Sequence, residues 1–320
     1  MNKRYFSSLI VLTILVGLLS AAWINRLYIY DYIRLWGYTP SSEVVELADS
    51  TTLYQNSRRL FYANQPVLAE KSAFNDFCRE DEQTIVLGCY ISGDGIYLLD
   101  VDDERLDGIK EVTAAHELLH AAYERLGSER SRIDDLINKT YNDLDNDRVK
   151  ETVELYRKQD PSIVPNELHS IVGTEVRQLP QELEDYYARY FRDRSKIVTL
   201  SEQYEQAFTE RRNQIRSFDK LLSELKIDIE SVQSKLTQLN QTLQIQRADM
   251  ERLRSSDRTD EYNSQVPIYN SRVNTYNQDL QKLQSLTIQH NDIVKKRNEI
   301  AIQEAELVEA IDSREAVPVR

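Results

Sequence analysis

The chain has 320 residues, 41% of them hydrophobic and 29% charged, which is sufficient for one hydrophobic core together with extended or anchoring segments. The net charge of -13 at pH 7 argues against a nucleic-acid partner, because binding to phosphates needs a basic surface. Only 8 Gly and 7 Pro are present, and this favours a mainly α fold with long helices over a turn-rich sheet protein.

The amino-terminal segment has the composition of a membrane anchor. Residues 5–25 carry no charge, and Leu9–Ile24 is almost continuously apolar behind Lys3 and Arg4. About 20 such residues span a bilayer, so residues 1–36 are predicted to form a transmembrane signal anchor. Cleavage at Ser20–Ala22 is the alternative. An aromatic belt of the kind found at membrane interfaces follows, with Trp23, Tyr28, Tyr30, Tyr32, Trp36 and Tyr38.

The segment after the anchor predicts a small α+β domain. Thr39–Ser42 ends the first helix and begins a helical pattern that runs as far as residue 66. Two β-branched, apolar stretches follow, Thr84–Ile91 and Ile96–Val101, with Ser92–Gly95 between them. This arrangement predicts a β-hairpin.

Cys78 and Cys89 are the only cysteines, and they flank the turn that precedes this hairpin. A pair so close in sequence predicts a disulfide, which would place most of the chain in an oxidising compartment. Two independent buried thiols are the alternative. With the anchor, the disulfide predicts a single-pass protein of the cell membrane whose domain lies outside the cytoplasm.

The segment Thr113–Ala122 contains a His-Glu-x-x-His pattern within apolar flanks. On a helix, residues four apart project from one face, so His116 and His120 can bind a single Zn²⁺. Glu117 lies about 100° round the helix from His116 and can accept a proton from a water that the metal activates. The alternative is a buried helix whose histidines and carboxylate hydrogen-bond one another, which is costly without a metal. The hairpin just before this helix can bind an extended peptide substrate as an added strand.

A catalytic zinc site needs a third protein ligand, and the stretch Asn166-Glu167-Leu168-His169-Ser170 offers one. Together with the His-Glu-x-x-His segment, this stretch resembles the gluzincins, the thermolysin-like zinc peptidases, in which the third ligand is the Glu of an Asn-Glu-x-x-Ser-Asp pattern. The resemblance covers these two short motifs and implies a zincin-like domain in which Glu167 is the ligand. Glu175 and then His169 are the alternative ligands.

The residue that follows this stretch departs from the gluzincin pattern. Ile171 stands where the gluzincins have an Asp that supports the first histidine, so we expect that support to come from Glu175 or Thr174. Helices are predicted over 129–144 and 149–157, and Pro180 begins another. The last of these carries Tyr186, Tyr187 and Tyr190, which are expected to pack in the core, with a hydroxyl directed at a reaction oxyanion as the alternative.

From about Ser195 onward, apolar residues recur in alternating steps of three and four, which is the heptad pattern of a coiled coil. The first seam is Phe218, Leu222, Leu225, Ile229, Val232, Leu236, Leu239, Leu243, Met250 and Leu253. The second is Val266, Tyr269, Val273, Tyr276, Leu280, Leu283, His290, Val294, Ala301, Val308 and Ile311. The polar stretch Ser255–Asp260 separates the seams, so we predict an antiparallel coiled-coil hairpin whose second helix restarts at Pro267.

The predicted organisation is therefore an anchor over 1–36, a zincin-like domain over 37–195, a coiled-coil arm over 196–312 and a tail over 313–320. The function that these features favour is a membrane-anchored zinc endopeptidase that cleaves a protein or peptide substrate, with Glu117 as general base. The arm is expected to act as a spacer, to self-associate or to bind a protein partner. The alternative function is a non-catalytic, membrane-tethered scaffold whose zincin-like domain holds a metal only for structure or has lost its activity.

Overall fold

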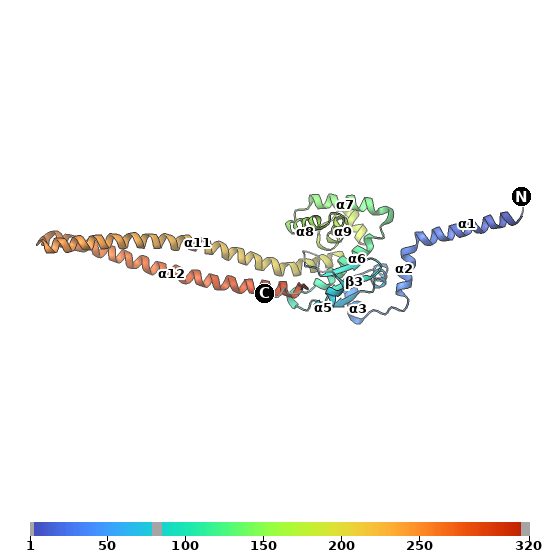
Figure 1. Cartoon of the computed structure of the whole chain (residues 1–320), viewed down its shortest axis with the longest axis horizontal. Coiled ribbons are helices and arrows are strands. Elements are labelled where there is room, and N and C mark those ends of the chain that lie inside the picture. Colours follow the sequence, from blue (N-terminus) through green and yellow to red (C-terminus); the bar gives the residue numbers. More distant parts are fainter. Residues whose placement is uncertain (1–2, 79–84, 315–320) are drawn as a thin grey trace. The chain divides into compact units, whose positions relative to one another are not determined.

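The computed structural model describes residues 3–78 and 85–314, with side chains from Leu12 onward. The protein is mostly helical and contains one small sheet (Figure 1). Contacts between Cα atoms divide it into two compact units, Met1–Ala207 with Leu307–Arg320, and Phe208–Glu306. The predicted strand start at Thr84 and most of the predicted tail 313–320 lie outside the described residues.

The amino-terminal segment forms two helices, α1 (Lys3–Ile24) and α2 (Arg26–Leu35), instead of one continuous helix. Within the described residues, no helix alone has the length and apolar character to cross a membrane, whereas Leu12–Ile24 and α2 meet that standard as a pair bent by 67°. The bend lies at Asn25, whose backbone leaves the helical region at φ -97° and ψ 13°. Its side-chain amide donates a hydrogen bond of 2.8 Å to the carbonyl of Ala21, which competes with the backbone ladder.

The helical pattern that follows is likewise divided, into α3 (Ser42–Ser50) and α4 (Gln55–Ala63). Ser41 caps α3 by accepting a hydrogen bond from the backbone N–H of Val44. Thr52 adopts a positive φ of 56° between the two helices, and this reverses the chain. The sequence pattern did not indicate this break because the apolar positions continue through it.

The predicted hairpin is present as β2 (Gly88–Ile91) and β3 (Gly95–Leu99), which pair antiparallel. A third strand, β1 (Val67–Ala69), pairs parallel with the other edge of β3, so the sheet order is β1-β3-β2. Three residues are too few to show an alternating pattern, and this strand was not predicted. Every residue of β3 is buried, so β3 forms the centre of the sheet.

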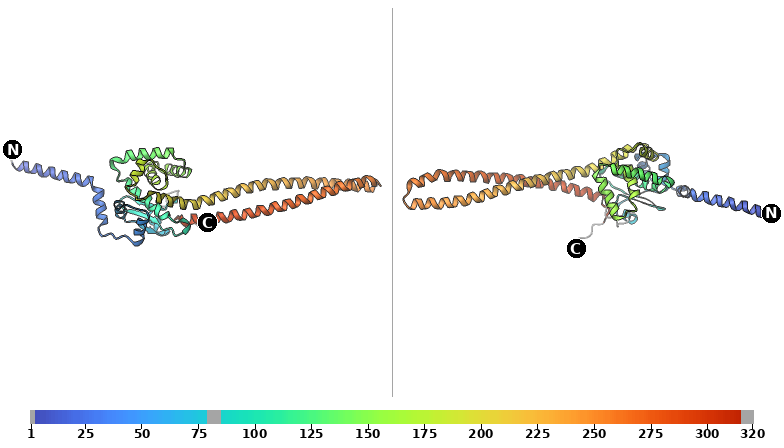
Figure 2. Two further views of the ribbon diagram at one scale, coloured as in Figure 1. Left: turned by 180° about the vertical axis from the view of Figure 1, so that it is seen from behind. Right: turned by 90° about the horizontal axis from the view of Figure 1, so that it is seen from above.

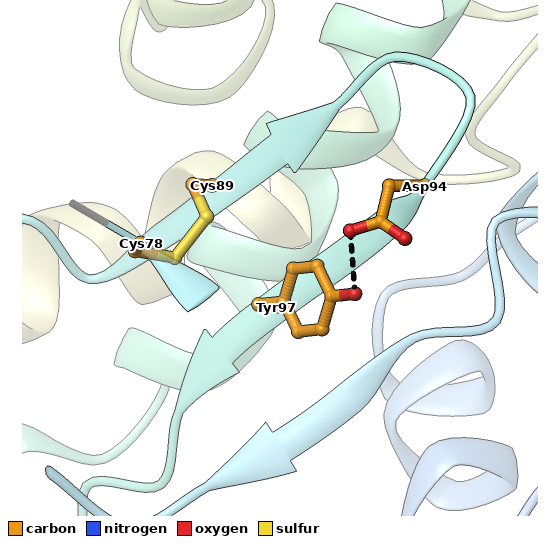
Figure 3. The surroundings of a disulfide bond; sticks show 4 residues. All are labelled: Cys78, Cys89, Asp94 and Tyr97. Carbon is orange, nitrogen blue, oxygen red and sulfur yellow. Dashed lines mark hydrogen bonds between the residues drawn. A yellow bond between two sulfur atoms is a disulfide. The ribbon is translucent and has the colours of Figure 1, made fainter. Parts of the chain in front are cut away.

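The predicted disulfide joins the end of a short helix to the edge of this sheet. Helix α5 (Lys71–Phe77) is followed directly by Cys78, which is bonded to Cys89 on β2 (Figure 3). Phe77 stacks on Tyr97 of β3 with ring centroids 4.2 Å apart, so α5 is held to the sheet by packing as well.

Helix α6 (Ile109–Tyr123) forms the middle of the domain, and all but three of its 15 residues are buried. It packs against β2 and β3 on one side and most extensively against α9 (Val164–Glu175) on the other. Gly173 allows the close crossing of α9 over α6, since a Cβ there would lie 2.5 Å from Leu119. The remaining short helices are α7 (Arg130–Asp143), α8 (Asp147–Gln159), α10 (Gln181–Tyr187) and the 3₁₀ turns Glu104–Leu106 and Gly127–Glu129.

Two long helices, α11 (Arg194–Ser255) and α12 (Thr259–Ile311), run side by side in opposite directions through the unit Phe208–Glu306 (Figures 1 and 2). Side chains connect them along their length, for example Arg297 with Asp219 at 3.1 Å. The predicted restart at Pro267 is wrong, because α12 begins at Thr259 and continues through the proline. The missing N–H of one proline removes a single hydrogen bond, which packing along the seam outweighs.

Candidate metal centre

His116 and His120 lie one turn apart on α6, and their rings point to the same side of the helix. The ring centroids are 4.7 Å apart in an edge-to-face arrangement. The helical spacing therefore brings two imidazole nitrogens together, as predicted from the sequence.

Glu167, on the first turn of α9, completes a group of three ligands. Its two carboxylate oxygens lie 3.4 Å from Nε2 of His116 and 3.6 Å from Nε2 of His120. One ligand atom from each of the three residues falls within 4.8 Å of the others. Two ligands that are each about 2.1 Å from a tetrahedral metal lie about 3.4 Å apart, so the two distances between the carboxylate and the imidazoles match a metal site.

A second observation favours a metal at this position. Oε2 of Glu167 is buried and accepts no hydrogen bond. A buried carboxylate oxygen without a donor is costly, and a cation bound between it and the two imidazoles would satisfy it. The donor set of two nitrogens and one oxygen is one that Zn²⁺ accepts in sites that keep a fourth position open. The residues present therefore fit a metal ion.

The three ligands influence one another's protonation. Burial alone would lower the pKa of His116, but the adjacent carboxylate of Glu167, together with the charge of Glu117, raises it to about 9. The pKa of His120 is lowered, chiefly by burial. Burial would raise the pKa of Glu167, yet the two histidines lower it, so its carboxylate is charged at neutral pH. Without a metal, His116 therefore carries a proton at neutral pH, while Glu167 is charged.

Ser170 supports His120, the second histidine. The expectation that Glu175 or Thr174 supports the first histidine, His116, stays a prediction; the charge of Glu175 does raise the pKa of His116. Oγ of Ser170 lies 3.4 Å from Nδ1 of His120, on the ring nitrogen opposite to the one that faces Glu167. The hydroxyl of Thr174 donates instead to the carbonyl of Ser170 at 2.8 Å. Because Ser170 occupies Nδ1, Nε2 of His120 is directed at the ligand group.

The two lower-ranked ligands are not part of this group. Glu175 forms an ion pair of 2.6 Å with Arg148. His169 points to the opposite side of α9, is fully buried, and lies 2.6 Å from the hydroxyl of Tyr186. Burial lowers the pKa of His169 to about 3, so its ring is neutral. The Tyr186 hydroxyl is thereby engaged in the core and is not among the groups that line the site.

The ligand group lies in a cleft of about 560 Å³. Glu117 lines this cleft beside His116, as do residues 85–87 and the strand β2. Tyr156, on α8, also lines it, and its hydroxyl contributes to the lowered pKa of Glu167. The cleft therefore holds a carboxylate, a phenol and a sheet edge around the three ligands.

The orientation of β2 exposes part of its backbone to this cleft. Leu87 accepts a hydrogen bond of 2.8 Å from the N–H of Leu99, and Cys89 is aligned with Tyr97. Because inward and outward groups alternate along an antiparallel pair, the N–H and C=O groups of Gly88 and Tyr90 point away from β3. β2 is the sheet edge next to α6, so an extended peptide could pair with it there.

Gly88 permits this close approach of strand and helix. A Cβ at this position would lie 2.6 Å from Cγ2 of Thr113 and 2.9 Å from Cγ of Glu117. Such contacts are shorter than any that packed side chains tolerate, so only glycine allows β2 to pass directly over Glu117.

Sequence reasoning missed three residues of this site. Ser170 carried a usable signal, since it is the serine of the Asn-Glu-x-x-Ser stretch itself. Tyr156 and Gly88 carried none, because their roles depend on which elements pack together and not on local spacing. No family model matches this chain, and searches of curated proteins and of solved structures find no significant match.

Proposed function

We propose that this protein is a zinc-dependent endopeptidase anchored in the membrane, with its domain outside the cytoplasm. The observation that carries the proposal is the convergence of His116, His120 and Glu167 in one cleft that Glu117 also lines. Structural zinc sites are closed by four protein ligands, whereas three ligands in an open cleft are typical of catalysis.

Zinc is the metal we assign, on the chemistry of the ligands and on the resemblance to the gluzincins. When bound, it would lower the pKa of a water molecule and polarise the carbonyl of the scissile bond. Glu117 would take a proton from the attacking water and pass it to the leaving amine. Its position on α6, beside His116, keeps the carboxylate close to the ligand group.

Two further features of the cleft are proposed to bind the substrate, the backbone of β2 and the side chain of Tyr156. The outward backbone groups of Gly88 and Tyr90 would pair with an extended peptide and lay its carbonyls along α6. Tyr156 would donate a hydrogen bond to the oxyanion that forms when the water adds to the carbonyl. Its side chain lines the cleft next to Glu167, which supports this role.

The location of the protein is assigned from its sequence and its disulfide. The apolar segment Leu9–Ile24 and the helices α1 and α2 that contain and follow it are proposed to anchor the chain. The bond between Cys78 and Cys89 supports an oxidising compartment for the domain.

The test is to purify the full chain, measure its zinc content and compare peptide cleavage by the natural protein and by Glu117→Gln. We expect both proteins to hold one zinc, and the variant to cleave about 10² to 10⁴ times more slowly. Treatment with a chelator should abolish cleavage and added zinc should restore it. One zinc per chain with no cleavage by either protein would favour the non-catalytic scaffold instead.

A further inference from the structure

Helix α2 binds the domain through one of its faces. Tyr30 and Arg34 donate hydrogen bonds to backbone carbonyls near the hairpin, and Asp31 pairs with Arg125, just after α6. These contacts are Tyr30 to Gly93 at 2.5 Å, Arg34 to Ala63 at 2.9 Å, and Asp31 to Arg125 at 2.6 Å. The helix is therefore held against the turn between β2 and β3 and against the end of the helix that carries the ligands.

The other face of α2 is apolar and exposed. We call it the outer face, and it consists of Tyr28, Ile29, Tyr32, Ile33 and Trp36. The residues Tyr28, Tyr32 and Trp36 are 73%, 67% and 87% exposed. Steps of four place these residues in one line along the helix. A contiguous apolar surface of this kind on a folded domain indicates that something covers it.

The segment that precedes α2 indicates that a lipid bilayer covers the outer face. Only Asn25 separates α2 from α1, whose described residues Leu12–Ile24 are apolar and exposed. The 67° bend between the two helices means that, where α1 crosses a bilayer, α2 turns away from the membrane normal towards the membrane plane. Tyrosine and tryptophan are the side chains that prefer the headgroup region, because their rings are apolar and their edges polar.

Two arginines add positive charge next to aromatic rings, one on the outer face and one at the end of α1. The guanidinium of Arg59 lies 5.9 Å from the ring centre of Tyr32, and that of Arg26 lies 4.8 Å from the ring centre of Trp23. A hollow of about 400 Å³ is bounded by Arg59, Tyr32, Leu35 and Trp36. Arginine beside aromatic rings at a membrane surface is suited to binding lipid phosphate.

We propose that the outer face of α2 lies in the headgroup region of the bilayer, with Arg59 bound to the phosphate of an anionic lipid. This rests on the proposed membrane anchor. Because the inner face of α2 holds the β2–β3 turn and the end of α6, the bilayer surface lies beside that end of the cleft. The substrates are then segments of membrane-anchored proteins close to the lipid surface.

The test uses the fact that the chain contains only two tryptophans, Trp23 and Trp36. The full chain is reconstituted into vesicles of equal parts phosphatidylcholine and phosphatidylglycerol, with bromine atoms placed either near the headgroup or near the middle of the acyl chains. Trp23→Phe reports on Trp36 alone, and Trp36→Phe reports on Trp23 alone. We expect bromine near the headgroup to quench Trp36 more strongly than deep bromine does.

Each outcome has a distinct meaning. Quenching of Trp23 without quenching of Trp36 would overturn the inference about α2 and leave the anchor intact. Quenching of neither would overturn both the inference and the anchor. If a second copy of the chain covers the outer face instead of lipid, bromine will not quench Trp36, and Tyr32→Cys will yield disulfide-linked dimers. Arg59→Gln should weaken the quenching of Trp36 in the mixed vesicles but not in phosphatidylcholine alone.

Discussion

Glu167 and Glu175 lie on the same helix, and the difference between them is what each carboxylate contacts. Glu167 faces two imidazoles with one oxygen lacking a hydrogen bond, whereas Glu175 is neutralised by Arg148 at 2.6 Å. The same residue type therefore has two roles, and the charge partner decides which. A carboxylate already paired with a guanidinium has little to offer a metal.

The first prediction follows from this contrast. Loss of a group that only hydrogen-bonds a metal ligand weakens metal binding about 10- to 100-fold. Glu167→Gln removes a ligand itself, so it should weaken zinc binding by more than this. Glu175→Gln is the matched control. It removes a charge that acts on His116 without removing a ligand, so its zinc affinity should change far less than that of Glu167→Gln. Competition with a chelating dye measures both affinities. Equal weakening by the two substitutions would show that Glu167 acts through the fold and not as a ligand.

The second prediction concerns pH. The carboxylates around His116 raise its pKa to about 9, so the metal-free site holds a proton at neutral pH. Zinc needs the neutral imidazole, and binding must therefore release that proton. Zinc affinity should rise with pH between about 6 and 8, by about tenfold per unit for one proton released. Titration calorimetry in buffers of different ionisation enthalpy counts the proton directly, and an affinity independent of pH would contradict the assignment.

At the scale of elements, the centre is built where three segments meet: α6, α9 and β2. Gly88 is a point of close approach, because a Cβ there would lie 2.6 Å from Cγ2 of Thr113 and 2.9 Å from Cγ of Glu117. The disulfide at Cys89 holds the next residue of the strand to the end of α5. The position of Glu117 in the cleft thus depends on how β2 packs on α6.

The third prediction tests this dependence. Gly88→Ala adds a methyl group 2.9 Å from Cγ of Glu117, which must move the strand or the carboxylate. We expect peptide cleavage to fall at least tenfold with zinc content unchanged, because the three ligands do not contact this position (about 1.4 kcal/mol per tenfold). Gly17→Ala, which has open space around it, is the control and should have no effect. Unchanged cleavage by the Gly88 variant would mean that Glu117 is not held by the strand.

The elements also show what local sequence could and could not predict. The long helices and the hairpin follow from periodicity, and His116, Glu117 and His120 follow from helical spacing alone. Glu167 needed the resemblance to a known motif, since it lies 47 residues beyond His120 in a different helix. Strand β1 and the contacts of Ser170 and Tyr156 depend on tertiary packing, whereas the bend at Asn25 coincides with a local side-chain hydrogen bond to Ala21. A periodic pattern encodes neither.

At the scale of the whole molecule, the candidate metal centre lies in only one of the two compact units. All residues that line the cleft lie between Ile85 and Tyr204, within the unit that also contains α1 and α2. The unit Phe208–Glu306 contributes none of them. It is a helical hairpin whose two helices pair with each other, for example through Gln246 and Arg272 at 2.5 Å. The candidate metal centre and the arm therefore belong to different units.

The fourth prediction concerns a variant that lacks the arm. Residues 208–306 are replaced by a short Gly-Ser linker, which keeps the first turns of α11 and the end of α12 that belong to the other unit. We expect this variant to bind zinc and to cleave a short peptide at the rate of the full chain, because the cleft is complete without the arm. Any self-association measured by light scattering, and any preference for a protein substrate over the peptide, should decrease. If peptide cleavage is lost while circular dichroism and zinc content show a folded domain, the arm acts on the cleft itself and is not an independent recruiting element.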